Sequence, residues 1–397
     1  MSDTPFAIAL CAIGLEKVCK AEMERLGLAA ENAGPGRLRL DLEASGARLS
    51  LSPEALLLRA NLCSRTAERV LIEAARFRAA DFDELFEGVR SVPWERFLRR
   101  EDRLVVERVR IRESRLSAQT SVQSVAHKAA YERLCRFYGL ERMPETGTAR
   151  SARIYLDGDE CVLGLDTSGE ALHKRGYRRA AGEAPLKETI AAGVLLLSGW
   201  SRRFPLFDPF CGSGTIGVEA ALFAADRAPG LGRAFAFEDM PFALDGGAPA
   251  RLSAEVEAAK ARVRRDAEYR IVLSDADPQA LEAARANASR AGVAAGLVFR
   301  RGRAEEAVPE YEEGYLLCNP PYGERLGSVP EAEALYRRLG EVAGRFDGWS
   351  LGFVTNRADF GDFFGAASPK PRAIVNGSEE QWFHWYPAAL GRGGRTR

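Results

Sequence analysis

The chain has 397 residues, of which 46% are hydrophobic and 28% are charged. These proportions are typical of a globular protein, and the length predicts two or three domains. Basic and acidic side chains number 56 each, so the net charge does not by itself indicate a nucleic-acid partner. No apolar run is long enough for a membrane helix, and no basic region precedes the first apolar stretch. We therefore expect no signal peptide and a cytoplasmic protein.

The cysteines and histidines lack the spacing of metal ligands. Seven cysteines are scattered without a C-x-x-C pair, and three histidines lie far apart in the chain. This pattern predicts reduced structural thiols and no metal site.

The amino-terminal half alternates short strands and helices. Strands are expected at residues 6–11, 37–42 and 104–111, helices at 15–26 and 121–138, and a hairpin at 154–165. Residues 96–153 carry 14 basic and seven acidic side chains, a pattern that fits either RNA-backbone binding or a solvated face. Together these features predict small α+β modules.

From residue 172 the pattern changes to repeated β-α units. Helices are expected at residues 186–198, 215–225 and 278–291, and strands at 205–207, 270–273, 297–299, 315–318 and 351–354. Residues 226–269 form an insertion, and residues 372–387 are expected to close the sheet as an antiparallel edge hairpin. The pattern predicts an α/β, mainly parallel sheet with its site at the carboxyl ends of the strands.

The first motif is PLFDPFCGSGTIGVEAA, in which a strand ends at Asp208 and a helix begins near Thr215. Gly212 and Gly214 permit a tight turn and a close backbone approach to a ligand. With Gly217 they also match the dinucleotide fingerprint. That reading needs an acid about 20 residues further on, at the tip of a second strand, and none follows a strand there.

The second motif, RIVLSDADPQALEAARANASRAG, places Asp275 at a strand end, where a carboxylate can accept the hydroxyls of a ribose. Asp277 is instead predicted to be the N-cap of the following helix, with Pro278 at its first position and Gly292 beyond its end.

The third motif, YLLCNPPYGERL, is the most specific of the three. The Asn319 side-chain carbonyl and the Pro320 backbone carbonyl could accept the hydrogens of an aromatic amine and favour a pyramidal, nucleophilic nitrogen. Pro320 and Pro321 stiffen the loop, and Tyr322 offers a ring on which an extruded base can stack. These four residues are the expected catalytic set.

These strings resemble the class I methyltransferases that modify exocyclic base amines. With LHKRGYR, APLKETIAAGVLLLSGW and APGLGRAFAFE, residues 172–387 resemble the RlmL-type ribosomal RNA guanine-N2 methyltransferases, whose relatives are often labelled adenine-specific DNA methylases. FDELFEGVRSVPWERFL and SVAHKAAYERLCRFYG resemble the THUMP RNA-binding module. The resemblance implies a ferredoxin-like domain at residues 1–60, a THUMP domain at 61–166 and a Rossmann-like methyltransferase domain at 167–397.

The resemblance also implies S-adenosylmethionine as the methyl donor. The expected cofactor residues are the strand ends and the turn between them, namely Asp208, Pro209, Gly212, Gly214, Thr215, Asp275, Ala276 and Asn319. Lys187 and Thr189 are expected either to line the cofactor side or to belong to a surface helix. Arg303 stands where related enzymes often place an acid near the adenine, so its contact and that of Glu305 are left open.

The expected reaction is methyl transfer to guanine N2 in RNA, with ribosomal RNA favoured. Three alternatives remain: a transfer RNA substrate, an adenine-N6 methyltransferase, and a non-catalytic RNA-binding assembly factor. The N-P-P-Y motif alone does not distinguish guanine from adenine.

Overall fold

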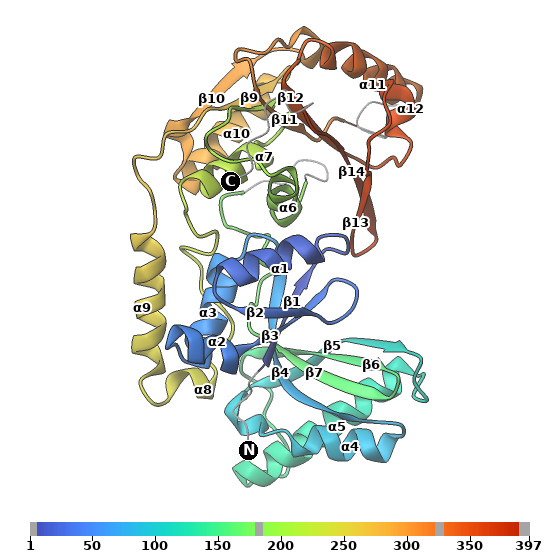
Figure 1. Ribbon diagram of the computed structural model, residues 1–397. Helices are drawn as coiled ribbons and strands as arrows, with labels where there is room; N and C mark the ends of the chain where they lie inside the picture. Colours follow the sequence, from blue (N-terminus) through green and yellow to red (C-terminus); the bar gives the residue numbers. More distant parts are fainter. Residues whose placement is uncertain (1–5, 179–185, 322–328, 389–397) are drawn as a thin grey trace. The chain divides into compact units, whose positions relative to one another are not determined.

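The computed structural model describes residues 6–178, 186–321 and 329–388. It divides into two compact units, each containing one seven-stranded sheet (Figure 1). Unit 1 comprises the described residues within 1–10, 20–172 and 232–258. Unit 2 comprises those within 11–19, 173–231 and 259–397.

The sheet of unit 1 has the order β2-β3-β1-β4-β7-β6-β5. Its strands are β1 (Phe6–Cys11), β2 (Ala29–Asn32), β3 (Arg37–Asp41), β4 (Ala67–Arg78), β5 (Arg103–Arg112), β6 (Ala149–Asp157) and β7 (Glu160–Asp166). The predicted hairpin is confirmed as β6 and β7, and β5 pairs with β6 in parallel. Strands expected in two separate domains thus lie in one sheet. The three-domain division remains a prediction.

The helices of the amino-terminal part are α1 (Glu16–Arg25), α2 (Leu42–Leu49), α3 (Pro53–Cys63), α4 (Phe82–Ser91) and α5 (Gln119–Tyr138). Helix α5 matches its prediction and ends at Gly139, which adopts the left-handed conformation. Helix α3 was not predicted. Eight of its eleven residues are buried, so its sequence lacks the polar face that marks an amphipathic helix.

The predicted insertion contains α8 (Pro241–Leu244) and α9 (Ala248–Ala261). Its residues 232–258 belong to unit 1, although the sequence suggested that they accompany the methyltransferase sheet. Arg59 of α3 donates two 2.9 Å hydrogen bonds to Glu255 of α9. Arg150 of β6 donates a 2.7 Å bond to Asp239. These ion pairs fix the insertion within unit 1.

The sheet of unit 2 has the order β10-β9-β8-β11-β12-β14-β13. Its strands are β8 (Leu206–Asp208), β9 (Ile271–Asp275), β10 (Leu297–Arg301), β11 (Gly314–Cys318), β12 (Trp349–Thr355), β13 (Arg372–Asn376) and β14 (Glu379–Tyr386). The first five of these run parallel, whereas β14 pairs antiparallel with both β12 and β13. The predicted doubly wound sheet with an edge hairpin is therefore confirmed.

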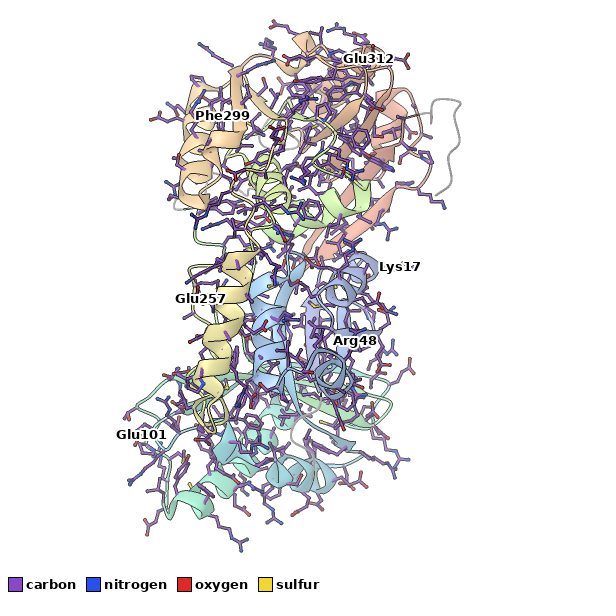
Figure 2. All side chains as sticks on the ribbon, turned by 60° about the vertical axis from the view of Figure 1, so that its left-hand side comes forward. Lys17, Arg48, Glu101, Glu257, Phe299 and Glu312 are labelled. Atoms are coloured by element: carbon purple, nitrogen blue, oxygen red, sulfur yellow. The ribbon has the colours of Figure 1, made fainter. Side chains whose placement is uncertain are left out.

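Two apolar layers cover this sheet. Helices α6 (Glu188–Ser198), α7 (Thr215–Ala224) and α10 (Pro278–Ala291) pack on one face, and α11 (Val329–Ala343) and α12 (Phe360–Phe364) on the other. Adjacent residues of β11 show the alternation, because Leu317 belongs to the first layer and Leu316 to the second. Phe299, labelled in Figure 2, lies on the outer strand β10. The guanidinium carbon of Arg285 lies 4.6 Å from the centroid of its ring.

None of the described helices is long and apolar enough to cross a membrane.

Candidate active site

Three neighbouring parallel strands bring the three sequence motifs to one edge of the sheet. Strand β8 lies between β9 and β11, with Asp208 opposite Leu273 and Phe207 opposite Leu316. Asp208 and Asp275 are the last residues of β8 and β9, and Asn319 directly follows β11. The motifs are therefore assembled at the carboxyl ends of the strands, where doubly wound sheets bind their ligands.

The glycine turn between β8 and α7 has two residues in the left-handed conformation. Gly212 has a φ of +50° and Gly214 a φ of +82°. A Cβ atom on Gly214 would lie only 2.9 Å from Ala284 Cβ, so glycine is needed there for both conformation and space. A Cβ atom on Gly212 would meet nothing within 4 Å, which leaves open space beside the turn.

Asp208 is almost completely buried, with 1% of its surface exposed. One of its carboxylate oxygens accepts a 3.1 Å hydrogen bond from the backbone N–H of Phe210. Burial, with a smaller contribution from the nearby charge of Asp275, raises the pKa of Asp208 well above its ordinary value. Burial and the neighbouring Asp208 likewise raise the pKa of the Cys318 thiol, which disfavours the nucleophilic thiolate.

Asp275 is partly exposed and braces the turn. Its Oδ2 accepts a 2.9 Å hydrogen bond from Gly212 N–H, and its Oδ1 accepts a 3.0 Å bond from Asp277 N–H. Each carboxylate oxygen retains a lone pair with which it could accept a ligand hydroxyl. Asp277 accepts from Gln279 N–H at 2.9 Å and is the N-cap of α10, as predicted.

Asn319 presents a buried acceptor. Its side-chain Oδ1 is shielded from solvent and has no hydrogen-bond partner among the described residues. Pro320, which follows it, is buried, and Pro321 is partly buried. Tyr322 was expected to stack on the base, but it lies outside the described residues. A buried oxygen without a partner is costly and suits a site that accepts a donor from a ligand.

The remaining expected residues are placed as follows. Thr215 is the buried first residue of α7, Pro209 is buried and Ala276 is exposed beside Asp275. Thr189 is buried within α6. Lys187 lies 3.7 Å from Glu379 of the edge hairpin. Their contacts with the cofactor remain predictions.

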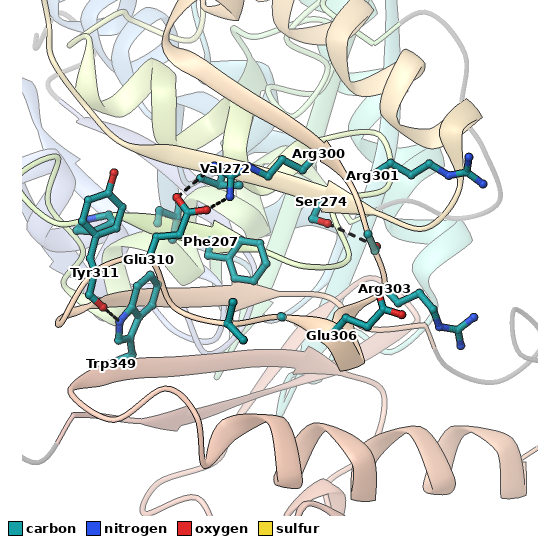
Figure 3. A pocket seen from close by; sticks show the side chains of 15 residues that line it. Phe207, Val272, Ser274, Arg300, Arg301, Arg303, Glu306, Glu310, Tyr311 and Trp349 are labelled. Carbon is teal, nitrogen blue, oxygen red and sulfur yellow. Dashed lines mark hydrogen bonds and ion pairs between the residues drawn. The ribbon is translucent and has the colours of Figure 1, made fainter.

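Arg303 lines a cavity of about 220 Å³ on the face of the sheet opposite α7, and Ser274, the residue before Asp275, lines it too. Phe207 and Val272 form part of its wall, and Figure 3 shows Arg303 at one end and Tyr311 at the other. The Arg303 side chain is 66% exposed and lies 3.5 Å from Glu305. The connection from β10 to β11 contains one short 3-10 turn and no α-helix, so this connection supplies no helix to cover the sheet here.

Two residues that contact the glycine turn were not predicted. Arg178 donates a 2.7 Å hydrogen bond to the Thr215 hydroxyl, and the Asn287 side-chain amide donates a 2.9 Å bond to the Ser213 carbonyl. The sequence did offer one indication for Asn287. Asparagine is a poor helix former, yet this residue lies in the interior of a helix with clear caps at both ends.

Within the described part of the chain, no group of three or more histidine, cysteine, aspartate or glutamate residues could hold a metal ion. A nucleoside-containing cofactor fits the open glycine turn, Asp275 and the Asn319 oxygen, which has no partner in the described part of the chain. The first two can receive its ribose and its chain, while the third remains available for a substrate donor.

Comparison with known proteins agrees with this geometry. Residues 175–381 match the family model described as the RMKL-like methyltransferase domain. The Bacillus subtilis protein named "Putative RNA methyltransferase YpsC" is 33% identical over 383 residues, which cover 96% of this chain and 95% of that protein. The solved structure of SMU.472, complexed with SAH, has a TM-score of 0.84 and 31% identity over the whole of both chains.

A longer relative is the ribosomal RNA large subunit methyltransferase K/L of Syntrophotalea carbinolica. It is 37% identical over 336 residues, which cover 80% of this chain but 46% of that protein. The chain thus spans about half the length of this relative. The family model and the near full-length match together show that the chain belongs to the RMKL-like methyltransferase domain family.

Proposed function

We propose that this protein transfers a methyl group from S-adenosylmethionine to the exocyclic N2 amine of a guanine in ribosomal RNA, in the cytoplasm. The observation that carries the proposal is the buried Oδ1 of Asn319, which has no hydrogen-bond partner among the described residues and directly follows β11, the strand next to β8. An acceptor in this position suits a substrate that brings its own N–H donor. An exocyclic amine is such a donor.

The cofactor assignment rests on the family and on the site. SMU.472, which matches the whole chain, is complexed with SAH, the product left when S-adenosylmethionine has given up its methyl group. When bound, S-adenosylmethionine supplies an electrophilic methyl group. In our proposal Asp275 accepts the ribose hydroxyls, and the Gly212–Gly214 turn gives the backbone close access to the rest of the molecule.

The role of the chain in the reaction is to orient the amine. An aromatic amine is a weak nucleophile because its lone pair is delocalised into the ring. Asn319 Oδ1 and the Pro320 carbonyl hold the two amine hydrogens, which favours a pyramidal nitrogen with an available lone pair. Pro320 and Pro321 restrict the loop, so both acceptors are in place before the substrate arrives.

RNA binding is assigned to unit 1. Arg108 and Arg110 are exposed on β5, the outer strand of its sheet, and neither lies within 4 Å of a carboxylate among the described residues. Their charges are therefore available for phosphate groups. Replacing both with alanine should weaken RNA binding and reduce its salt dependence without altering cofactor binding. Equal replacement of Arg112, which pairs with Asp157, serves as the control.

The choice of ribosomal RNA follows the K/L relatives, and the choice of guanine follows the RlmL-type strings around Asn319. The test is to incubate the purified protein with isotopically labelled S-adenosylmethionine and, separately, unmodified ribosomal RNA, transfer RNA and DNA. Nucleoside mass spectrometry then identifies the product. N2-methylguanosine in ribosomal RNA supports the proposal. Label found only on adenine, or only in transfer RNA or DNA, refutes it.

A further inference from the structure

A closed ring of hydrogen bonds surrounds the glycine turn. On one side, the guanidinium of Arg178 donates to the Thr215 hydroxyl at 2.7 Å. On the other, the buried side-chain amide of Asn287 donates to the Ser213 carbonyl at 2.9 Å. The turn is thus held from two elements, the segment before α6 and the middle of α10.

Arg290, one turn after Asn287 on α10, closes the ring. Its guanidinium donates to the side-chain oxygen of Asn287 and also to the backbone carbonyl of Tyr177. Because Tyr177 precedes Arg178, the contacts run from the turn through α10 and back to the turn without a break.

The segment that carries Arg178 is itself anchored in the core. The Tyr177 side chain is buried, and its hydroxyl donates a 3.0 Å hydrogen bond to Glu219, which is completely buried on α7. Arg178 also donates to the Leu186 carbonyl at 3.1 Å and lies 3.5 Å from Glu188. Moving this segment would break several hydrogen bonds, and the one between Tyr177 and Glu219 lies in the buried core.

The turn needs such support, because its own sequence does not rigidify it. Gly212 and Gly214 both adopt positive φ, and Gly214 caps α7 without any side-chain hydrogen bond. Glycine loses more conformational entropy on ordering than any other residue. If the turn were mobile in the ligand-free protein, ligand binding would have to order it. The conformational entropy lost in that step would weaken binding.

We propose that Arg178 and Asn287 are positioning residues that hold the Gly212–Thr215 turn in its ligand-binding conformation before the methyl donor arrives. This inference rests on the proposed function, since it takes the turn as the cofactor site. Neither residue needs to touch the cofactor. Their effect should therefore appear in cofactor affinity and not in the rate at saturating cofactor.

The test compares Arg178→Met, Asn287→Leu and the double variant with the wild type. Arg285→Met, on the outer side of α10 beside Phe299, is the matched control. Titration with SAH is expected to show a dissociation constant raised about three- to tenfold in each single variant, the scale of one net hydrogen bond. The turnover number at saturating methyl donor should stay within about twofold of the wild type.

Two further readouts separate positioning from general destabilisation. Because one break already opens the ring, the double variant should lose much less affinity than the product of the two single effects. Arg178→Lys, which keeps a donor, should recover part of the loss. Unchanged affinity in folded variants, or fully multiplicative losses, would overturn the inference.

Hydrogen–deuterium exchange of residues 211–216 in ligand-free protein distinguishes this inference from the proposed function. Faster exchange in Arg178→Met and Asn287→Leu, but not in Arg285→Met, supports positioning even if the wild type fails to bind SAH. In that case only the proposed function would fail. Unchanged exchange would refute positioning whatever the protein binds.

Discussion

Replacing Asn319 with alanine should slow methyl transfer without the loss of stability that removing a buried polar group usually causes. In the ligand-free protein, Asn319 Oδ1 is buried without a partner among the described residues, a situation that costs about 1–3 kcal/mol. Alanine removes that cost, so the free energy of unfolding should not fall by the amount expected for a buried polar residue. It also removes the acceptor for the substrate amine.

The expected catalytic loss follows from the same range. A lost acceptor worth about 1–3 kcal/mol in the transition state lowers the rate roughly fivefold to 150-fold. The assay is single-turnover methyl transfer to RNA at saturating methyl donor. Titration with SAH and urea denaturation measure cofactor affinity and stability in parallel. Asn32→Ala, at an exposed position on β2, is the control.

An unchanged rate for Asn319→Ala would refute the reasoning, because the amine would then not be held at this oxygen. A large loss of SAH affinity with little further loss in rate would also refute it, since Asn319 would then serve the cofactor and not the substrate.

Three further predictions follow from other parts of the molecule. Asp275→Ala should mainly weaken SAH binding, because it removes both the proposed ribose acceptor and the hydrogen bond that holds Gly212 in the turn. An unaltered dissociation constant for SAH, measured by calorimetry, would count against this. The pKa of Asp208 is raised in the folded state, so folding favours the protonated side chain. The contribution of Asp208 to the free energy of unfolding is therefore fully present below its unfolded-state pKa. That contribution is lost as pH rises through its folded-state pKa. Asp208→Asn should therefore gain stability over the wild type as pH rises above about 4. A difference in the free energy of unfolding that does not change with pH in urea denaturation would contradict it. In unit 1, Arg150→Met leaves the buried Asp102 without its 3.1 Å partner and should cost about 3 kcal/mol in urea denaturation; a loss below about 1 kcal/mol would show that the pair is not structurally important.

The sequence by itself determined the features that depend on neighbouring residues. Helix α10 begins and ends where its Asp277 cap, Pro278 and Gly292 predict, because capping is a contact within a few residues. The strand-turn-helix around Gly212 and Gly214 is likewise local, since only glycine tolerates those dihedral angles without strain. Periodicity was enough to predict the doubly wound sheet and its edge hairpin.

Only the tertiary structure decided which distant segments meet. Residues 232–258 join unit 1 through Arg59 and Glu255, which are 196 positions apart, and no local pattern encodes such a pairing. Arg178 and Asn287 contact the glycine turn from two different parts of the chain, so the sequence alone does not predict these contacts. The physical reason is that capping and backbone strain act within a few residues, whereas hydrogen bonds and ion pairs join whichever side chains packing brings together.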